Sequence, residues 1–312
     1  IQSEYLIDAA DFIACHNPSY VTRYDMVSDL KEGGAFLLNC EWTSVEALEK
    51  ELPAKMKNIL AKKHAKLYVI DAIKIAGELG LRGKTSTILQ SAFFCINPQI
   101  MPYESADKND KNTAVALMKY MAYKSFSRKG DAIVQMNYNA IDSAKENLVK
   151  IDIPASWATT SEGAEMVKLA DNDYFKNVVA PILALEGDKL PSSAFNADGS
   201  VPTGTTKFEK RGVAVLVPEW NIDKCIQCAQ CSFVCPHATI RPYLVAEGTS
   251  APADFKTKPA LQAKGYGFRI QVSPLDCMGC GVCADVCPVN QKAGSDAAKN
   301  GTKVDPANRA LN

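Results

Sequence analysis

Short apolar runs alternate with amphipathic stretches along the first 150 residues. Residues 11–15, 35–40 and 66–71 are mostly apolar and have the length of a strand. Such continuous runs are typical of strands that are buried on both faces of a sheet. Apolar side chains recur at helical spacing in residues 72–79, 86–95, 111–127 and 131–148. Strands that alternate with helices predict an α/β domain with a mostly parallel sheet.

Local signals mark the starts of two further helices in this region. Thr43 or Ser44 can cap a helix, and Glu46 would then fall near its first turn. Pro53 favours the first position of a second helix, which we expect to run to about Lys63.

The pattern changes after residue 150. Residues 151–216 mix Pro, Gly, Ser and Asp with apolar patches, and only 173–185 has helical character. We expect this stretch to be an extended arm laid over other surfaces. Residues 213–217 and 268–272 are apolar and β-branched, which predicts two strands, each ahead of a cysteine-rich run. Residues after Asn290 are polar and rich in Ala and Gly, so we expect a frayed tail.

Two cysteine runs share one spacing, C-x-x-C-x-x-C-x-x-x-C-P. They are Cys225, Cys228, Cys231 and Cys235 before Pro236, and Cys277, Cys280, Cys283 and Cys287 before Pro288. This is the run of bacterial two-cluster ferredoxins, in which the fourth cysteine of each run ligates the other cluster. The first three thiolates of a run can bind three irons on one face of a cubic cluster. The fourth cysteine is too distant to bind the remaining iron of the same cluster.

The spacing therefore predicts two [4Fe–4S] clusters with crossed ligands. The first would be held by Cys225, Cys228, Cys231 and Cys287, and the second by Cys277, Cys280, Cys283 and Cys235. Pro236 and Pro288 would turn the chain away after each crossing ligand. A strand before each run predicts a duplicated ferredoxin-like α+β arrangement.

Two other uses of these cysteines remain to be weighed. A structural zinc site needs four thiolates, usually as two C-x-x-C pairs, whereas here a tighter pattern occurs twice. Cysteines so close along the chain have poor geometry for disulfides, and their total of 11 is odd. Cys15, Cys40 and Cys95 are too scattered to indicate a metal site, and we expect buried structural thiols there.

Composition excludes several classes of function. The formal net charge is zero, so nothing favours binding to nucleic acid or to an anionic membrane. No apolar run is long enough to span a bilayer. Many cysteines without a visible secretory signal favour a reducing cytoplasm, and thiolate-held clusters are typical of anaerobes. No glycine-rich nucleotide motif is present.

Two loops carry candidate chemistry. Arg82, Gly83, Lys84, Thr85 and Ser86 precede a predicted helix, where cations and free N–H groups would suit a phosphate. An ordinary helix cap with solvated charges is the competing interpretation. Cys15-His16-Asn17-Pro18 follows a strand, and the alternatives there are a ligand loop or a plain turn.

Five short segments carry a family resemblance, and the last of them reaches the first cysteine of the second run. They are residues 11–20 with 33–40, residues 205–212 with their Glu-Lys-Arg sequence, and residues 217–220 with 272–277. With these motifs the chain resembles the pyruvate:ferredoxin (flavodoxin) oxidoreductases over nearly its whole length. The resemblance implies a gamma-type α/β domain at 1–150, an extended linker with the Glu-Lys-Arg segment at 151–216, a ferredoxin-like two-cluster domain at 217–295 and a tail at 296–312.

The same resemblance implies a reaction and its partners. Members convert pyruvate and coenzyme A to acetyl-CoA and carbon dioxide and pass electrons to ferredoxin or flavodoxin. The family also uses thiamine diphosphate, Mg²⁺ and a further [4Fe–4S] cluster, and the parent protein would be a homodimer. Arg82 or Lys84 would contact a coenzyme A phosphate.

The chain departs from the family pattern in what it lacks. It has no Gly-Asp-Gly motif for Mg²⁺ and no third cysteine set, and its first strand reads as if already inside a sheet. We therefore expect a central slice of a longer enzyme that does not oxidise pyruvate alone. The alternatives are a piece of another 2-oxoacid:ferredoxin oxidoreductase, or a zinc-stabilised interaction module without a redox role.

Overall fold

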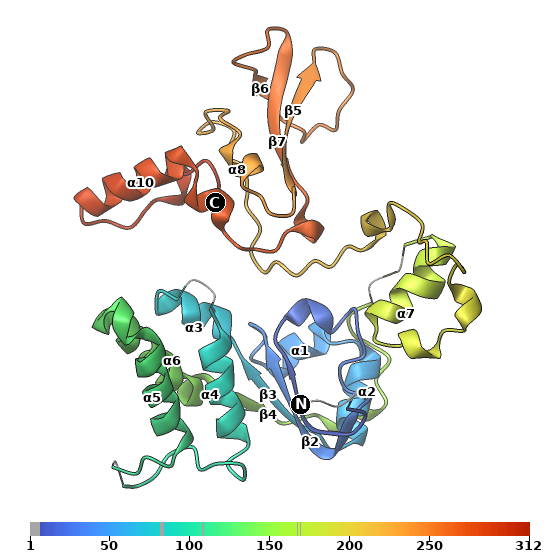
Figure 1. Ribbon diagram of the computed structural model, residues 1–312, viewed down its shortest axis with the longest axis vertical. Helices are drawn as coiled ribbons and strands as arrows, with labels where there is room; N and C mark the ends of the chain where they lie inside the picture. The colour runs from blue at the N-terminus through green and yellow to red at the C-terminus, as the bar shows by residue number, and fades with distance from the viewer. Residues whose placement is uncertain (1–6, 82–83, 108, 167, 169) are drawn as a thin grey trace. The chain divides into compact units, whose positions relative to one another are not determined.

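The chain folds into two compact units, Ile1–Ala194 and Phe195–Asn312. The computed structural model describes residues 7–81, 84–107, 109–166, 168 and 170–312 (Figure 1). The boundary between the units lies inside the stretch 151–216 that the sequence predicts as a linker. None of the helices within the described ranges is long and apolar enough to cross a membrane.

A four-stranded mixed sheet forms the centre of the first unit. Its strands are β1 (Ala10–Cys15), β2 (Leu30–Asn39), β3 (Lys66–Ile70) and β4 (Val149–Ile151), in that spatial order. β1, β2 and β3 are parallel, and β4 pairs with β3 in the antiparallel sense. The predicted mostly parallel α/β sheet is confirmed, although the three residues of β4 are too few to give a sequence pattern.

Helices cover both faces of this sheet because neighbouring β2 side chains point in opposite directions. Phe36 and Leu38 pack on one face in a core shared with α1 (Val45–Glu51) and α2 (Ala54–Lys62). Leu37 packs on the other face. The helices there are α3 (Ala72–Glu78), α4 (Ser86–Ile96) and α6 (Asp131–Asn147), and α5 (Ala114–Phe126) packs on α4 and α6 (Figure 1).

The two predicted helix starts lie within one residue of the observed starts of α1 and α2. Ser44, rather than Thr43, caps α1 by accepting the N–H of Ala47 over 3.2 Å, and Glu46 lies in the first turn. Pro53 is the residue before α2 rather than its first residue.

The rest of the first unit is made of short turns. Residues 173–185 form a π-helical turn, η4 (Phe175–Val179), followed by α7 (Ala180–Leu183), with Pro181 in the first turn of α7. Among the described residues of both units, the 3-10 helices are η1 (Pro18–Tyr20), η2 (Ser127–Lys129), η3 (Ala155–Ala158), η5 (Gly187–Lys189), η6 (Ser192–Ala194), η7 (Thr205–Phe208), η8 (Pro274–Asp276) and η9 (Pro306–Asn308).

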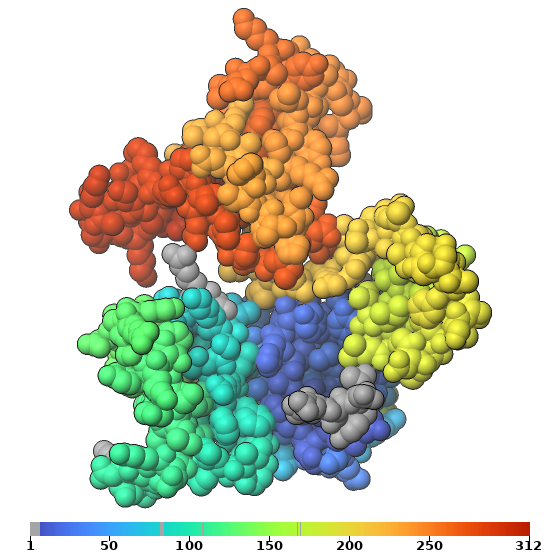
Figure 2. Space-filling model, viewed as in Figure 1, coloured from blue at the N-terminus to red at the C-terminus, as the bar shows by residue number. Residues whose placement is uncertain are grey.

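The second unit has a small antiparallel sheet in the order β5-β7-β6. The strands are β5 (Ile240–Ala246), β7 (Tyr266–Val272) and β6 (Lys258–Pro259), and the helices are α8 (Gln230–Phe233), α9 (Val282–Asp285) and α10 (Pro288–Lys299). Ile240, Phe268, Ile270, Cys283 and Leu311 form its core. Within this unit the β5–β7 hairpin and α10 extend from the core in different directions (Figures 1 and 2).

Two predictions for this unit are wrong. Residues 213–217 form no strand, and β7 instead pairs along its whole length with β5, a segment for which the sequence predicted no strand. The tail is not frayed, because α10 runs to Lys299 and Leu311 is buried in the core. Glu219 and Asn312 exchange two backbone hydrogen bonds of 3.0 and 3.1 Å, which hold the last residues in place.

Candidate functional site

The two cysteine runs adopt the same backbone conformation at equivalent positions. In the first run Gln227 and Ala229 have φ of 60° and 57°. In the second, Gly279 and Gly281 have φ of 66° and 77°. Left-handed residues alternating with right-handed ones turn successive N–H groups toward one side of a loop, which makes a concavity for an anionic group. Gln and Ala reach this conformation only at a steric cost.

Backbone N–H groups in both loops point at cysteine sulfurs. The N–H of Gln227 lies 3.4 Å from Cys225 Sγ, and that of Gly279 lies 3.3 Å from Cys277 Sγ. Such contacts stabilise a thiolate and tune a metal bound to it. The repeated sequence spacing therefore corresponds to a repeated local structure.

Four cysteines from both runs line one cavity of about 280 Å³ in the second unit. They are Cys235 from the first run and Cys277, Cys280 and Cys283 from the second. The structure thus brings together the four residues predicted for the second cluster, including the crossing one.

The remaining predicted ligands lie in the same small unit. Cys225 and Cys231 pack at the edge of its core with Cys283, and Cys287 is buried at the residue before α10. Cys228 is exposed.

Burial and crowding control the ionisation of the site thiols. Burial first, and then the proximity of Cys225, Cys228 and Cys283, raises the pKa of Cys231 to about 11. The same two causes raise the pKa of Cys283, with Cys277, Cys280 and Cys235 as the neighbours. Metal binding requires thiolates, so loading this site would release protons.

Thr239 is a site residue that the sequence pattern does not reveal. Its Oγ1 lies 3.2 Å from Cys235 Sγ, and its backbone N–H lies 3.3 Å from the same sulfur. Burial opposes ionisation of Cys235, but these hydrogen bonds and others from nearby N–H groups outweigh it and lower the pKa. Only a threonine four residues after the last cysteine could have hinted at this contact.

The cavity fits an iron–sulfur cluster. In a tetrahedral zinc site the four sulfurs lie about 2.3 Å from one ion, so a zinc ion needs far less room than a cavity of this volume. In the parts of the chain that the structure describes, no group of three His, Cys, Asp or Glu residues is placed to hold a single metal ion. Four cysteines around a cavity, with N–H groups aimed at the sulfurs, match the donor set of a larger cluster.

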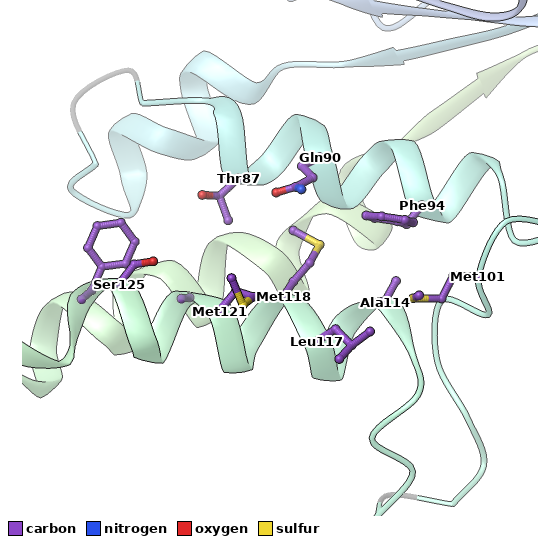
Figure 3. Close-up of a pocket in the computed structure, with 11 residues that line it drawn as sticks. Thr87, Gln90, Phe94, Met101, Ala114, Leu117, Met118, Met121 and Ser125 are labelled. Atoms are coloured by element: carbon purple, nitrogen blue, oxygen red, sulfur yellow. The ribbon is translucent and has the colours of Figure 1, made fainter. Parts of the chain in front are cut away.

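A second cavity, of about 310 Å³, lies in the first unit between α4 and α5 (Figure 3). Thr87, Gln90 and Phe94 of α4 face Met118 and Met121 of α5 across it. Its lining is mostly apolar, with the polar side chains of Thr87 and Gln90 on α4 and of Ser125 on α5, which is the usual character of a site for an organic ligand.

The predicted phosphate contacts lie just before α4. Lys84 is exposed, and Arg82 lies outside the described residues. Thr85 occupies the cap position of α4 but makes no side-chain capping hydrogen bond, so the capping interpretation does not hold for its side chain.

The cysteines outside the two runs are structural. Cys15 and Cys40 are buried in the core of the first unit, and burial raises their pKa to about 11 and about 12. Cys95 is half-buried in α4. In the Cys15–Pro18 loop the side chain of Asn17 accepts the N–H of Ser19 over 3.0 Å and so caps η1.

Three family models match the chain in series. Pyruvate ferredoxin/flavodoxin oxidoreductase covers residues 1–147, a domain of unknown function named EKR covers 160–214, and a 4Fe-4S dicluster domain covers 224–291. Among solved structures, a pyruvate oxidoreductase subunit, PORC, from Thermotoga maritima matches 48% of this chain and 69% of its own, with 17% identity and a TM-score of 0.35.

Curated relatives align along almost the whole chain. The pyruvate:ferredoxin oxidoreductase of Moorella thermoacetica is 51% identical and the pyruvate-flavodoxin oxidoreductase of Klebsiella pneumoniae is 43% identical, each over 94% of this chain. The chain spans 24% of the length of either relative. By these matches, the chain belongs to the pyruvate:ferredoxin/flavodoxin oxidoreductase family.

Proposed function

We propose that this chain is the gamma-type and electron-relay portion of a pyruvate:ferredoxin or pyruvate:flavodoxin oxidoreductase. The names of the relatives support pyruvate over other 2-oxoacids. The observation that carries the relay role is the cavity lined by Cys235, Cys277, Cys280 and Cys283. Residues 1–150 would be the gamma-type domain, 151–216 the linker and 217–295 the two-cluster domain.

The reaction of the full-length protein would determine how many electrons this portion has to carry. Pyruvate and coenzyme A would give acetyl-CoA, carbon dioxide, one proton and two electrons. A bound [4Fe–4S] cluster supplies one-electron transfer, so the two electrons would leave singly toward ferredoxin or flavodoxin. Thiamine diphosphate, Mg²⁺ and a further cluster would serve the carbon chemistry in the full-length protein, and this chain alone would not turn over pyruvate.

The residues of this chain would hold and tune the two clusters. Cys225, Cys228, Cys231 and Cys287 would hold the first, and Cys277, Cys280, Cys283 and Cys235 the second. The N–H groups of Gln227 and Gly279 and the hydroxyl of Thr239 would donate to ligand sulfurs and favour the more negative, reduced state.

Crossed ligation is tested with serine variants of the full-length protein, prepared without oxygen. Cys235→Ser and Cys283→Ser should alter the same EPR signal, whereas Cys287→Ser and Cys231→Ser should alter the other. Cys95→Ser is the matched control, because this thiol lies outside both runs, and it should keep both signals. If Cys287→Ser instead altered the same signal as Cys283→Ser, the crossed assignment would be wrong.

Metal analysis separates the relay from a zinc-stabilised module. Two clusters require about eight iron and about eight sulfide per chain beyond any other cluster of the protein. Their loss in a Cys231→Ser/Cys283→Ser variant, with no change in zinc, would support the relay. Zinc in place of iron in the anaerobically prepared protein would overturn it.

We also propose that Arg82 or Lys84 contacts a coenzyme A phosphate. Lys84 lies just before α4, whose first-turn N–H groups receive no side-chain cap from Thr85. Thr87 in that turn lines the cavity of Figure 3, so a cation, a helix start without a side-chain cap from Thr85 and a ligand-sized cavity lie along one helix.

Replacing Arg82 and Lys84 with Ala in the full-length protein should raise the KM for coenzyme A and leave the KM for pyruvate unchanged. The exposed Lys74 of α3 serves as the matched control for lost surface charge. An unchanged coenzyme A KM at low ionic strength, where such contacts are strongest, would remove this proposal.

A further inference from the structure

The Glu-Lys-Arg segment lies against the second cysteine loop. Lys210 Nζ is 2.6 Å from Asp276 Oδ2, and Asp276 immediately precedes Cys277. The N–H of Gly212 donates to the carbonyl of Leu275 over 2.9 Å. An ion pair and a backbone hydrogen bond therefore join this segment to the two residues in front of the loop.

The contact continues at Gly279, inside the loop itself. A Cβ on Gly279 would lie 3.2 Å from the carbonyl oxygen of Leu216 and 3.4 Å from the Cα and Cβ of Ala214. These distances are close to or below ordinary van der Waals contact, so the missing side chain lets residues 214–216 lie directly over the loop. The left-handed φ of Gly279 favours glycine for a second reason.

The same segment then forms part of the cavity wall. Leu216, Val217 and Pro218 line the cavity together with the four cysteines. These apolar side chains would limit the access of water to a bound cluster. Solvent exposure and nearby charge are two of the factors that set the reduction potential of such a cluster.

We propose that residues 209–218, here called the clasp, cover the second cluster and set the charge beside it through Lys210 and Asp276. This assigns a role to the C-terminal part of the family segment of unknown function and to the residues that follow it. It rests on the proposed function, because it requires a cluster on Cys235, Cys277, Cys280 and Cys283. The segment would keep the cluster from leaving the cavity, and the charges of Lys210 and Asp276 would set its reduction potential.

The two charges of the Lys210–Asp276 pair should act in opposite directions on the reduction potential. Lys210→Met leaves the Asp276 carboxylate unpaired next to Cys277, which disfavours the added electron and lowers the potential. Asp276→Asn leaves the Lys210 ammonium, which raises it. The double variant restores neutrality beside Cys277, so its reduction potential should return toward that of the wild type. It should still lose its cluster faster, because the Lys210–Asp276 ion pair no longer holds the clasp against the cysteine loop.

The experiment uses the full-length protein with its clusters, and EPR-monitored potentiometry follows the signal that Cys283→Ser removes. We expect each single variant to change the reduction equilibrium about threefold to tenfold, where a tenfold change is about 59 mV for a one-electron couple. Absorbance bleaching by an iron chelator gives the rate of cluster loss, which needs no enzyme activity. Lys210→Arg keeps the charge and should keep the potential.

Lys292→Met with Asp296→Asn is the matched control, because this Lys–Asp pair of 2.8 Å lies in α10 of the same unit. Single variants that shift the potential in the same direction, or by no more than this control pair, would overturn the tuning role. A double variant that loses iron no faster than the control would overturn the retention role. A wild-type protein without the second cluster would instead reject the proposed function.

Discussion

Thr239 shows how a single side chain distinguishes two otherwise similar cysteine runs. It is buried, and its Oγ1 lies 3.2 Å from Cys235 Sγ. The equivalent cysteine of the second run, Cys287, is followed directly by α10, whose helical backbone leads away from it. The two proposed clusters would therefore differ in their hydrogen bonding although their ligand spacing is the same.

Replacing Thr239 with Val should lower the reduction potential of the second cluster. The change removes the hydroxyl donor, keeps the shape of the side chain and leaves the backbone N–H in place. A hydrogen bond of this kind contributes about 0.5–1.5 kcal/mol, which is about a twofold to twelvefold change in the reduction equilibrium. Potentiometry on Thr239→Ser, which retains a hydroxyl, provides the control, and equal potentials for the two variants would contradict the prediction.

At the scale of elements, η3 lies just before the EKR-matched region and is hydrogen-bonded to α1 and α2. Trp157 is 1% exposed, and its Nε1 donates to Glu49 Oε1 over 3.2 Å. Asn58 of α2 donates to the carbonyls of Trp157 and Thr160, both over 2.9 Å. The buried Lys57 ammonium donates to the Glu49 carbonyl and lies 5.9 Å from the Trp157 ring centroid.

Trp157→Ala should destabilise this contact by about 3–5 kcal/mol, because it empties a large buried volume beside the sheet. Hydrogen–deuterium exchange of the α2 amides in the full-length protein measures it, and about 3 kcal/mol corresponds to more than about a hundredfold faster exchange. Tyr120→Ala, an exposed aromatic of α5, is the control. Unchanged protection in Trp157→Ala would show that η3 contributes little to this face of the sheet.

The elements also show what sequence patterns could and could not predict. Continuous apolar runs identified β1, β2 and β3 because side chains of each strand pack into the cores on both faces of the sheet. Ser44 marked a helix start through the hydrogen bond by which it caps α1. β5 carries mostly exposed side chains and contains Pro242, so its sequence resembles a loop, although β7 pairs with it throughout. Residues 213–217 are apolar because they lie over the cysteine loop rather than because they form a strand.

At the scale of the whole molecule, the two units are stabilised in different ways. The first has a large apolar core on both faces of a sheet. The second has a small core in which cysteines are a substantial part of the packed surface. Small domains with limited cores commonly depend on bound metal for stability, so the proposed clusters would be structural as well as functional. Cysteine spacing predicted which residues gather here, whereas the contribution of Thr239 and of the clasp depends on tertiary contacts.

The paired backbone hydrogen bonds between Glu219 and Asn312 have a consequence for the protein before any cluster is bound. They join two stretches that are far apart in the sequence, and both cysteine runs lie between them. Closing such a long loop removes many of the conformations in which the two runs would separate. The thiols would therefore be held near one another before iron arrives, which lowers the entropic cost of assembling a cluster on them.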